Sequence, residues 1–233
     1  MYFFTQSLFH SILPYYCVLC EEKSALKIDL CESCKLLLCK KQPACEYCGN
    51  TIHHHQAFRQ CGHCLNNPPH FDRLVFVGNY ETHLQKMIIG LKFNQQLFMS
   101  RILGSLLAEN ILQERFSRPD CIIPVPLHFK RQRERGFNQA LEIARIVSKQ
   151  LHLPIDYTLC TRIRATPPQS SIKAKARKQN VRHAFKVTRT LPYRHVAIID
   201  DVVTTTSTVN ELSKMLKLAG VDYIQIWCVA RTT

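Results

Sequence analysis

The spacing of apolar residues divides the chain into stretches of different structure. Between residues 83 and 112, apolar side chains recur at helical spacing in two segments, 83–93 and 97–112. Leu84, Met87 and Ile88 belong to the first of these stripes. The pattern predicts two helices whose apolar faces pack against a core.

In the second half of the chain, short apolar runs alternate with helical segments. The runs at 121–127, 196–203 and 222–230 are typical of buried strands, and the segments at 138–150 and 208–219 are typical of helices. This alternation indicates a parallel sheet with helices on both faces, and such sheets bind ligands at the carboxyl ends of their strands. We therefore expect an α/β fold.

The first 64 residues follow another pattern, with eight of the twelve cysteines in four Cys-x-x-Cys pairs. Two such pairs present four thiolates that can close around one tetrahedral Zn²⁺. Spacers of ten and twelve residues between neighbouring pairs suit short ribbon-like units. We expect two structural zinc sites, one formed by Cys17, Cys20, Cys31 and Cys34 and the other by Cys45, Cys48, Cys61 and Cys64.

Other arrangements of these ligands stay open at this point. A cross-braced pairing is compatible with the spacing, and the run His53–His55 could supply a ligand. A disulfide framework is disfavoured because a secreted chain needs an export signal, and the sequence shows none. Since every coordination position would be filled, we expect structural rather than catalytic sites. The segment has too little apolar material to fold unaided, so we expect metal binding and folding to be one event.

The segment 68–72 (PPHFD) is typical of a hinge. We expect an N-terminal arm and double zinc-ribbon domain at 1–67 and the α/β domain at 68–233. The first sixteen residues are apolar but lack the basic region and cleavage site of a signal peptide, which favours a docked arm over a membrane-surface or partner contact. No stretch reaches the roughly 20 uncharged apolar residues of a spanning helix, and we expect a cytoplasmic protein.

The net charge of +14 is concentrated in one part of the chain. Residues 121–194 contain sixteen Lys and Arg against three acidic residues, a balance of +13, so the remainder of the chain sums to +1. A basic region of this size attracts phosphate-rich partners. The sequence therefore favours binding of nucleic acid or of a phosphorylated small molecule.

The segment 196–208 combines a strand, two carboxylates and a helix start. Asp200 and Asp201 follow four apolar residues, at a place where core packing does not call for charge. Hydroxyl-bearing residues then lead into a helix N-terminus, where free N–H groups favour an anion. A simple N-cap at Ser207 or Thr208 would explain the helix start but not the two aspartates. The combination predicts a ribose-phosphate site.

This loop resembles the signature of type I phosphoribosyltransferases, which bind phosphoribosyl pyrophosphate, and the chain as a whole resembles the ComF/GntX family. The resemblance includes the double zinc ribbon and four further segments: LKF (91–93), PVPLHFKRQRERGFNQ (124–139), RIRATPPQS (162–170) and ARKQNVRHAF (176–185). It implies a type I phosphoribosyltransferase-like parallel sheet with helices on both faces, preceded by a small zinc-ribbon domain with four cysteine ligands per ion.

The resemblance also implies roles for individual residues. Asp200 and Asp201, as catalytic residues, would hold the ribose hydroxyls directly or through Mg²⁺. The 5′-phosphate would lie against Val203, Thr204, Thr205, Thr206, Ser207 and Thr208. The turn at Pro126 would correspond to the pyrophosphate loop, and phosphate oxygens would be bound by Arg131, Arg133, Arg135 and Asn138. Residues 165–180 resemble the flexible loop that closes over substrate in active enzymes.

The chain departs from the family pattern at Thr206, where the family usually has glycine. Glycine accepts positive φ at no steric cost, whereas a β-branched residue there costs about 1–2 kcal/mol. Either the loop follows another path in this chain, or it accepts the strain.

Three functions are compatible with these features. The ComF resemblance implies a competence-associated protein that handles incoming single-stranded DNA during natural transformation, with other competence proteins as partners. The loop is compatible with an active phosphoribosyltransferase, of the glycosyltransferase class, with an unspecified acceptor. The zinc ribbons are compatible with a protein-interaction adaptor.

Overall fold

The computed structural model describes residues 14–39, 42–52, 59–165 and 181–232. Most of the expected N-terminal arm, the run His53–His55 and nearly all of the loop expected at 165–180 lie outside these residues. The chain forms two compact units, Met1–Lys40 and Lys41–Thr233, and each is described by itself.

The first unit contains a hairpin and a short helix. The first Cys-x-x-Cys pair lies between β1 (Tyr15–Tyr16) and β2 (Lys23–Ser24), which pair antiparallel, and the second pair lies at the start of α2 (Glu32–Leu38). The hydroxyl of Ser24 donates to the carbonyl of Leu30 at 2.8 Å. This bond joins the hairpin to the segment that leads into the helix.

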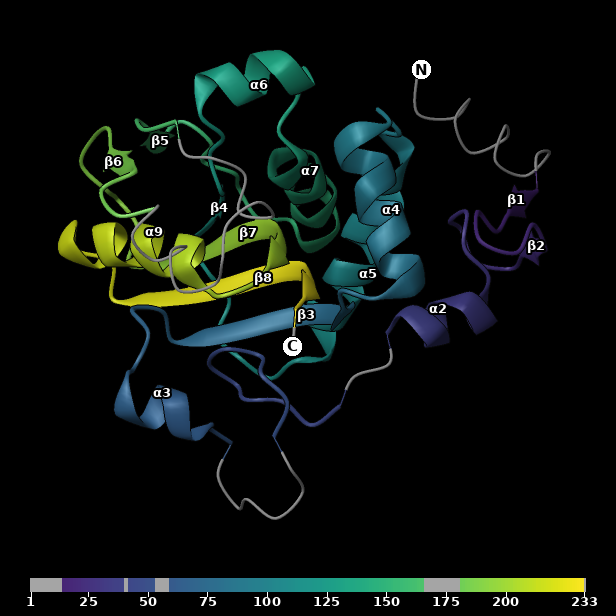
Figure 1. Cartoon of the computed structure of the whole chain (residues 1–233), viewed down its shortest axis with the longest axis horizontal. Helices are drawn as coiled ribbons and strands as arrows, with labels where there is room; N and C mark the ends of the chain where they lie inside the picture. The colour runs from purple at the N-terminus through teal and green to yellow at the C-terminus, as the bar shows by residue number, and fades with distance from the viewer. Residues whose placement is uncertain (1–13, 40–41, 53–58, 166–180, 233) are drawn as a thin grey trace. The chain divides into compact units, whose positions relative to one another are not determined.

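The second unit is built on a parallel four-stranded sheet (Figure 1). Its order is β3 (Arg73–Asn79), β8 (Tyr223–Arg231), β7 (His195–Val203) and β4 (Cys121–Pro124), and every neighbouring pair is parallel. The predicted α/β class and three of these strands are confirmed. The pattern of the sequence does not predict β3, which follows directly on the hinge-like segment.

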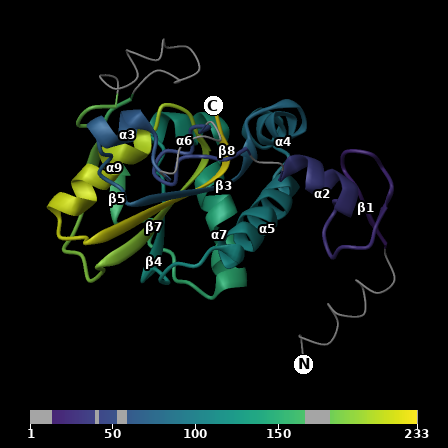
Figure 2. The same ribbon diagram turned by 90° about the horizontal axis from the view of Figure 1, so that it is seen from below.

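Helices cover both faces of the sheet (Figure 2). α9 (Ser207–Leu218) lies on one face, and α5 (Phe98–Gln113) and α7 (Gln139–Leu151) lie on the other, with α4 (Thr82–Phe93) packed against α5. The four predicted helices are confirmed, with ends within one residue of the expected ones. None of the helices in the described part of the chain is long and apolar enough to span a bilayer.

Side chains along the central strands point alternately toward one helical layer and the other. Ile198 and Ile226 are fully buried in a core that includes Leu212 of α9. Their neighbours along the strands point to the opposite face, where the indole of Trp227 is also fully buried. Apart from the buried Gln225 of β8, the interiors of both central strands are therefore apolar on two faces until they approach the carboxyl edge of the sheet.

Two further elements lie above that edge and were not predicted. α6 (Phe129–Arg135) follows β4 and ends at Gly136, whose φ of 82° suits glycine. β5 (Cys160–Arg162) and β6 (Phe185–Val187) form an antiparallel hairpin. Together they add polar and cationic side chains around the ends of the parallel strands.

The second cysteine-rich segment packs with the sheet. Cys61 directly precedes α3 (Gly62–Asn66), and the amide of Leu74 in β3 donates to the carbonyl of Glu46 at 2.9 Å. This segment covers part of the edge strand β3. The boundary at 67/68 remains our proposal for the organisation of the sequence, while the compact units divide between residues 40 and 41.

Candidate functional site

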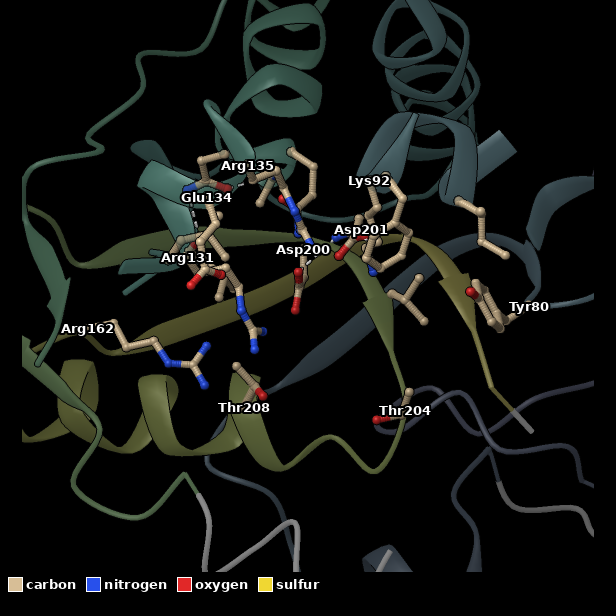
Figure 3. A pocket seen from close by; sticks show the side chains of 18 of the residues that line it. Tyr80, Lys92, Arg131, Glu134, Arg135, Arg162, Asp200, Asp201, Thr204 and Thr208 are labelled. Atoms are coloured by element: carbon tan, nitrogen blue, oxygen red, sulfur yellow. Dashed lines mark hydrogen bonds and ion pairs between the residues drawn. The ribbon is translucent and has the colours of Figure 1, made fainter. Parts of the chain in front are cut away.

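A cavity of about 710 Å³ opens at the carboxyl edge of the sheet (Figure 3). Its walls come from the ends of β3, β4 and β7, from α4 and α6, and from the first turn of α7. The polar and charged side chains around it are those of Tyr80, Lys92, Gln95, Arg131, Glu134, Arg135, Asn138, Gln139, Arg162, Asp200, Asp201, Thr204 and Thr208. Parallel sheets bind ligands at this edge.

The two neighbouring aspartates of β7 have different surroundings. Asp201 is 3% exposed and forms an ion pair with Lys92 of α4. Asp200 is half-buried, and its carboxylate accepts a hydrogen bond from the amide of Asp201 at 2.9 Å. In Figure 3 the Asp200 side chain points into the cavity, whereas that of Asp201 points toward Lys92. Asp200 is thus the carboxylate presented to a ligand.

Burial and neighbouring charges shift the pKa values of several groups in the site. Burial raises the pKa of Asp200 well above its usual range, the adjacent Asp201 carboxylate raises it further, and Lys92 opposes both effects. Burial lowers the pKa of Arg135 and of Arg162, although arginine stays charged in proteins. The cavity therefore combines permanent cations with one carboxylate that is costly to ionise.

The arginines reach the cavity from two elements. Arg131 and Arg135 lie one turn apart on α6 and line the cavity, whereas Arg133 is on the exposed side of the helix. The Arg135 guanidinium lies over the ring of Phe93, 5.2 Å from its centroid. Arg162, at the end of β5, lies 5.5 Å from the ring centroid of Phe185. These aromatic faces stabilise the guanidinium groups of Arg135 and Arg162.

The loop between β7 and α9 forms another wall. Thr204 and Thr208 line the cavity, and Val203, Thr206 and Ser207 lie around a small hollow beside it. Thr206 has a φ of 59°, and its carbonyl accepts a hydrogen bond from the amide of Asn210 at 2.8 Å. The loop thus accepts a β-branched residue in the left-handed region.

Some residues expected at the site have other positions or partners. Pro126 and Arg133 are not among the residues around the cavity. Asn138 lines it, but its side chain caps α7 through the amide of Ala140 and donates to the carbonyl of Val125 at 3.1 Å. The hydroxyl of Thr205 pairs with that of Ser207 at 2.9 Å.

Among the residues that line the cavity, Lys92, Arg162 and Tyr80 were not predicted for the site. Lys92 and Arg162 fall within segments that resemble the ComF/GntX pattern, LKF and RIRATPPQS, so that resemblance was the available signal. Tyr80 follows the unpredicted strand β3, and no pattern in the sequence indicated it. All three reach the cavity from elements far from the 196–208 loop.

The eight Cys-x-x-Cys cysteines form two clusters by sequential pairing. One contains Cys17, Cys20, Cys31 and Cys34 and the other Cys45, Cys48, Cys61 and Cys64, with the Sγ atoms of each cluster within 4.8 Å of one another. One Sγ pair in each cluster is 3.6 Å apart. Zn–S bonds of about 2.3 Å in a tetrahedron require Sγ separations of about 3.8 Å. Both clusters therefore fit a tetrahedral metal ion, and the cross-braced alternative is not what the structure shows.

Comparison with known proteins connects these features to a family. Competence protein F of Haemophilus influenzae is 37% identical over 212 residues, which cover 88% of this chain and 91% of that protein. The DNA utilization protein YhgH of Escherichia coli is 36% identical over 225 residues, covering 94% of this chain and 98% of that protein. The chain belongs to the ComF/GntX family. The predicted resemblance is confirmed.

No family model matches the sequence of this ComF/GntX member. Among solved structures, glutamine phosphoribosylpyrophosphate amidotransferase of B. subtilis superposes with a TM-score of 0.35 and 20% sequence identity, over 55% of this chain and 25% of that chain.

Replacing Thr206 with glycine should stabilise the second unit. Glycine removes the Cβ strain at φ 59°, which is worth about 1 kcal/mol after allowing for the greater freedom of glycine in the unfolded chain. Trp227 is the only tryptophan and is fully buried in β8, so its fluorescence during denaturant unfolding reports this unit. Thr206→Ala keeps the Cβ and is the control that should show no gain. Equal unfolding midpoints for wild type and Thr206→Gly would show that the backbone at Thr206 is not strained.

Replacing Asp200 with asparagine should stabilise the protein more at higher pH. A folded-state pKa above the unfolded value means that folding disfavours the ionised carboxylate, so the penalty is absent below the unfolded pKa and full above the folded one. The gain in melting temperature for Asp200→Asn should therefore grow from pH 5.5 to pH 8.5, a range that keeps thiolate ligands available for metal. Asp222→Asn, at a largely exposed carboxylate, is the matched control. A gain that shrinks as pH rises is the result that contradicts this prediction.

Proposed function

We propose that this ComF/GntX protein handles single-stranded DNA in a competence-related role and that its cavity binds a ligand of the phosphoribosyl pyrophosphate type. The names of the relatives, competence protein F and DNA utilization protein, support the general role. One observation carries the ligand class: Asp200 and the N-terminus of α9, with Thr204 and Thr208, face the same cavity. A carboxylate suits ribose hydroxyls, and a helix N-terminus suits a phosphate.

The cations of the cavity extend this proposal to a second phosphate group. Arg131 and Arg162 enter from different elements, and their guanidinium groups point toward the space between Asp200 and Thr208 in Figure 3. Arginine binds phosphate oxygens with two parallel N–H bonds. A volume of about 710 Å³ is within the range of small-molecule sites. These features favour a ligand that carries both a sugar and more than one phosphate.

Metal ions belong to the proposal in two places. Four thiolates in a tetrahedral arrangement are typical of structural Zn²⁺, so we propose two zinc ions, one in each cysteine cluster. Mg²⁺ would accompany the phosphate ligand at Asp200, because Asp201 is already paired with Lys92. Reduced thiolates of this kind suit the cytoplasm, which we propose as the location of the protein.

The exposed cations near the cavity support DNA binding. Lys130 and Arg133 are exposed on α6, and Arg182 and Lys186 are exposed beside the β5–β6 hairpin. Contacts between such side chains and backbone phosphates supply most of the sequence-independent affinity for DNA. Phe129, next to Lys130 at the start of α6, is also exposed and offers a face on which a base can stack. A single strand can therefore bind along this surface.

A second candidate function is phosphoribosyl transfer. The cavity wall formed by Tyr80, Ile89 and Phe93 is largely apolar and aromatic, and Asp200 lines the same cavity. A flat nitrogen-containing acceptor fits against such a wall. In the reaction a nitrogen lone pair forms a bond to the anomeric carbon, pyrophosphate leaves with the electron pair of the broken C–O bond, and the nitrogen releases its proton to water. The site would act by positioning and by charge stabilisation.

Calorimetric titration with phosphoribosyl pyrophosphate and Mg²⁺ tests the ligand. Wild type should bind, and Asp200→Asn should bind about 10- to 100-fold more weakly, because a charge-assisted hydrogen bond is worth roughly 1.5–3 kcal/mol. Asp222→Asn is the matched control, since Asp222 lies at the amino end of β8, away from the cavity. No heat with wild type, or equal affinities for wild type and Asp200→Asn, would refute the assignment.

Salt-dependent binding of a fluorescent single-stranded oligonucleotide tests the DNA surface. Lys130→Glu/Arg133→Glu removes two exposed cations outside the cavity and should weaken binding and make the slope of log affinity against log salt shallower by about 1.4. Lys149→Glu/Lys214→Glu changes the net charge equally at exposed positions of α7 and α9 and should leave the slope nearer that of wild type. Equal effects of the two double variants would show that only net charge matters and would refute this surface.

A further inference from the structure

The last strand of the sheet ends in a buried arginine that contacts two separate segments. Arg231 is 4% exposed. Its Nε donates to the carbonyl of Cys48 at 2.6 Å, and its Nη2 donates to Oδ1 of Asn50. Its Nη1 donates to the carbonyls of Val203, at 3.3 Å, and of Thr204. One guanidinium thus joins the second cysteine cluster to the start of the loop that leads into α9.

The contact with the cysteine cluster is closely packed as well as hydrogen-bonded. Gly49 lies between the two residues that accept from Arg231 and has a φ of 72°. A Cβ at Gly49 would lie 3.1 Å from Cγ of Arg231 and 3.1 Å from Cδ2 of Leu74. The turn Cys48–Asn50 therefore lies directly on the arginine stem, and no larger residue fits between them without a shift.

Charge also connects this arginine to the cluster. Its hydrogen bonds go to neutral carbonyl and amide oxygens, which compensate a buried cation only in part. Four thiolates around a divalent metal ion carry a net charge of about −2. Cys48, one of the four thiolate residues, also supplies the carbonyl that accepts from Nε. The metal-loaded cluster therefore stabilises the guanidinium where it lies.

The contact with the loop fixes the place where the chain leaves the sheet. Val203 is the last residue of β7, and its carbonyl also accepts from the amide of Thr232 at 3.1 Å. Thr204 follows it and lines the cavity. Two residues later the loop reaches the left-handed Thr206. A loop with such a residue keeps its shape only where its ends are held.

We propose that Arg231 is a positioning residue that couples metal binding at the second cysteine cluster to the shape of the loop 203–208. The metal orders the turn Cys48–Asn50, the turn holds the guanidinium, and the guanidinium holds the carbonyls of Val203 and Thr204. The proposal relies on the proposed function only for the ligand of the loop. The contacts that carry it do not depend on that ligand.

Amide hydrogen exchange of the full-length, metal-loaded protein tests the coupling without any ligand. Arg231→Lys keeps a cation but cannot reach all the acceptors with one ammonium group, so exchange at 203–208 should rise at least tenfold. The bound metal should remain at two ions per chain. Arg73→Lys is the matched control, because Arg73 pairs with Glu114 at 2.7 Å and lies at the amino end of β3, at the opposite edge of the parallel sheet from the loop. Unchanged exchange at 203–208 in Arg231→Lys would overturn the proposal.

Metal removal provides the second arm of the test. In wild type, a chelator should raise exchange at 203–208 at least tenfold while Ile198 and Ile199 in β7 stay protected. In Arg231→Lys, the same treatment should add less than threefold, because the connection is already broken. Equal chelator effects in both proteins would overturn the proposal. If Arg231→Lys does not fold, Asn50→Ala, which removes only the bond to Nη2, replaces it with the same expected directions.

Ligand titration distinguishes this proposal from the proposed function. If wild type binds phosphoribosyl pyrophosphate, the Arg231→Lys variant should bind this ligand about tenfold more weakly, although residue 231 is not among those that line the cavity. If wild type does not bind that ligand, the proposed function fails, and hydrogen exchange alone decides whether the metal centre controls the loop. Tight binding by Arg231→Lys together with unchanged exchange would refute the coupling and leave the function intact.

Discussion

The parallel pairing of β7 with β8 is the constraint on which the rest of the second unit depends. The pairing aligns Asp200 with Cys228 and Val203 with Arg231, so it fixes the carboxylates and the buried arginine at one edge. Apart from the buried Gln225, the interiors of both strands are apolar on two faces, and their acidic residues and arginine lie near the carboxyl ends. The cavity and the cysteine cluster are then built around these two strand ends.

The same strand pairing explains why the two adjacent carboxylates of the site cost folding free energy. A strand with two adjacent carboxylates near its carboxyl end needs cations from elsewhere, and Lys92 of α4 provides one by pairing with Asp201. Ionisation of Asp200 is unfavourable at this position, as the raised pKa of its carboxyl shows. A fold selected for stability alone would not place a second carboxylate here. Perturbed groups of this kind, gathered in a cavity, are typical of sites that bind or react.

Sequence alone could predict those parts of the structure that depend on local pattern. Apolar runs predicted β4, β7 and β8, and apolar residues at helical spacing predicted α4, α5, α7 and α9. β3 was missed because its short run directly follows a segment interpreted as a hinge. α6 was missed because its sequence FKRQRER contains no apolar stripe. Spacing predicted both cysteine clusters but left their pairing open, since pairing depends on distances between turns.

The site itself could be predicted only in part, because its contacts join distant elements. The aspartates and the threonine loop lie together in the sequence, whereas Lys92 and Arg162 reach them through the tertiary fold. Thr206 shows the limit most clearly: the sequence left open whether the loop would change its path or accept strain. The structure shows strain between two held ends, with Arg231 on the Val203 side and the first turn of α9 on the other. A loop held in this way is ordered before a ligand arrives, so less ordering entropy is lost on binding. The second cysteine cluster is therefore part of the support of the site, although the sequence places it in a separate region.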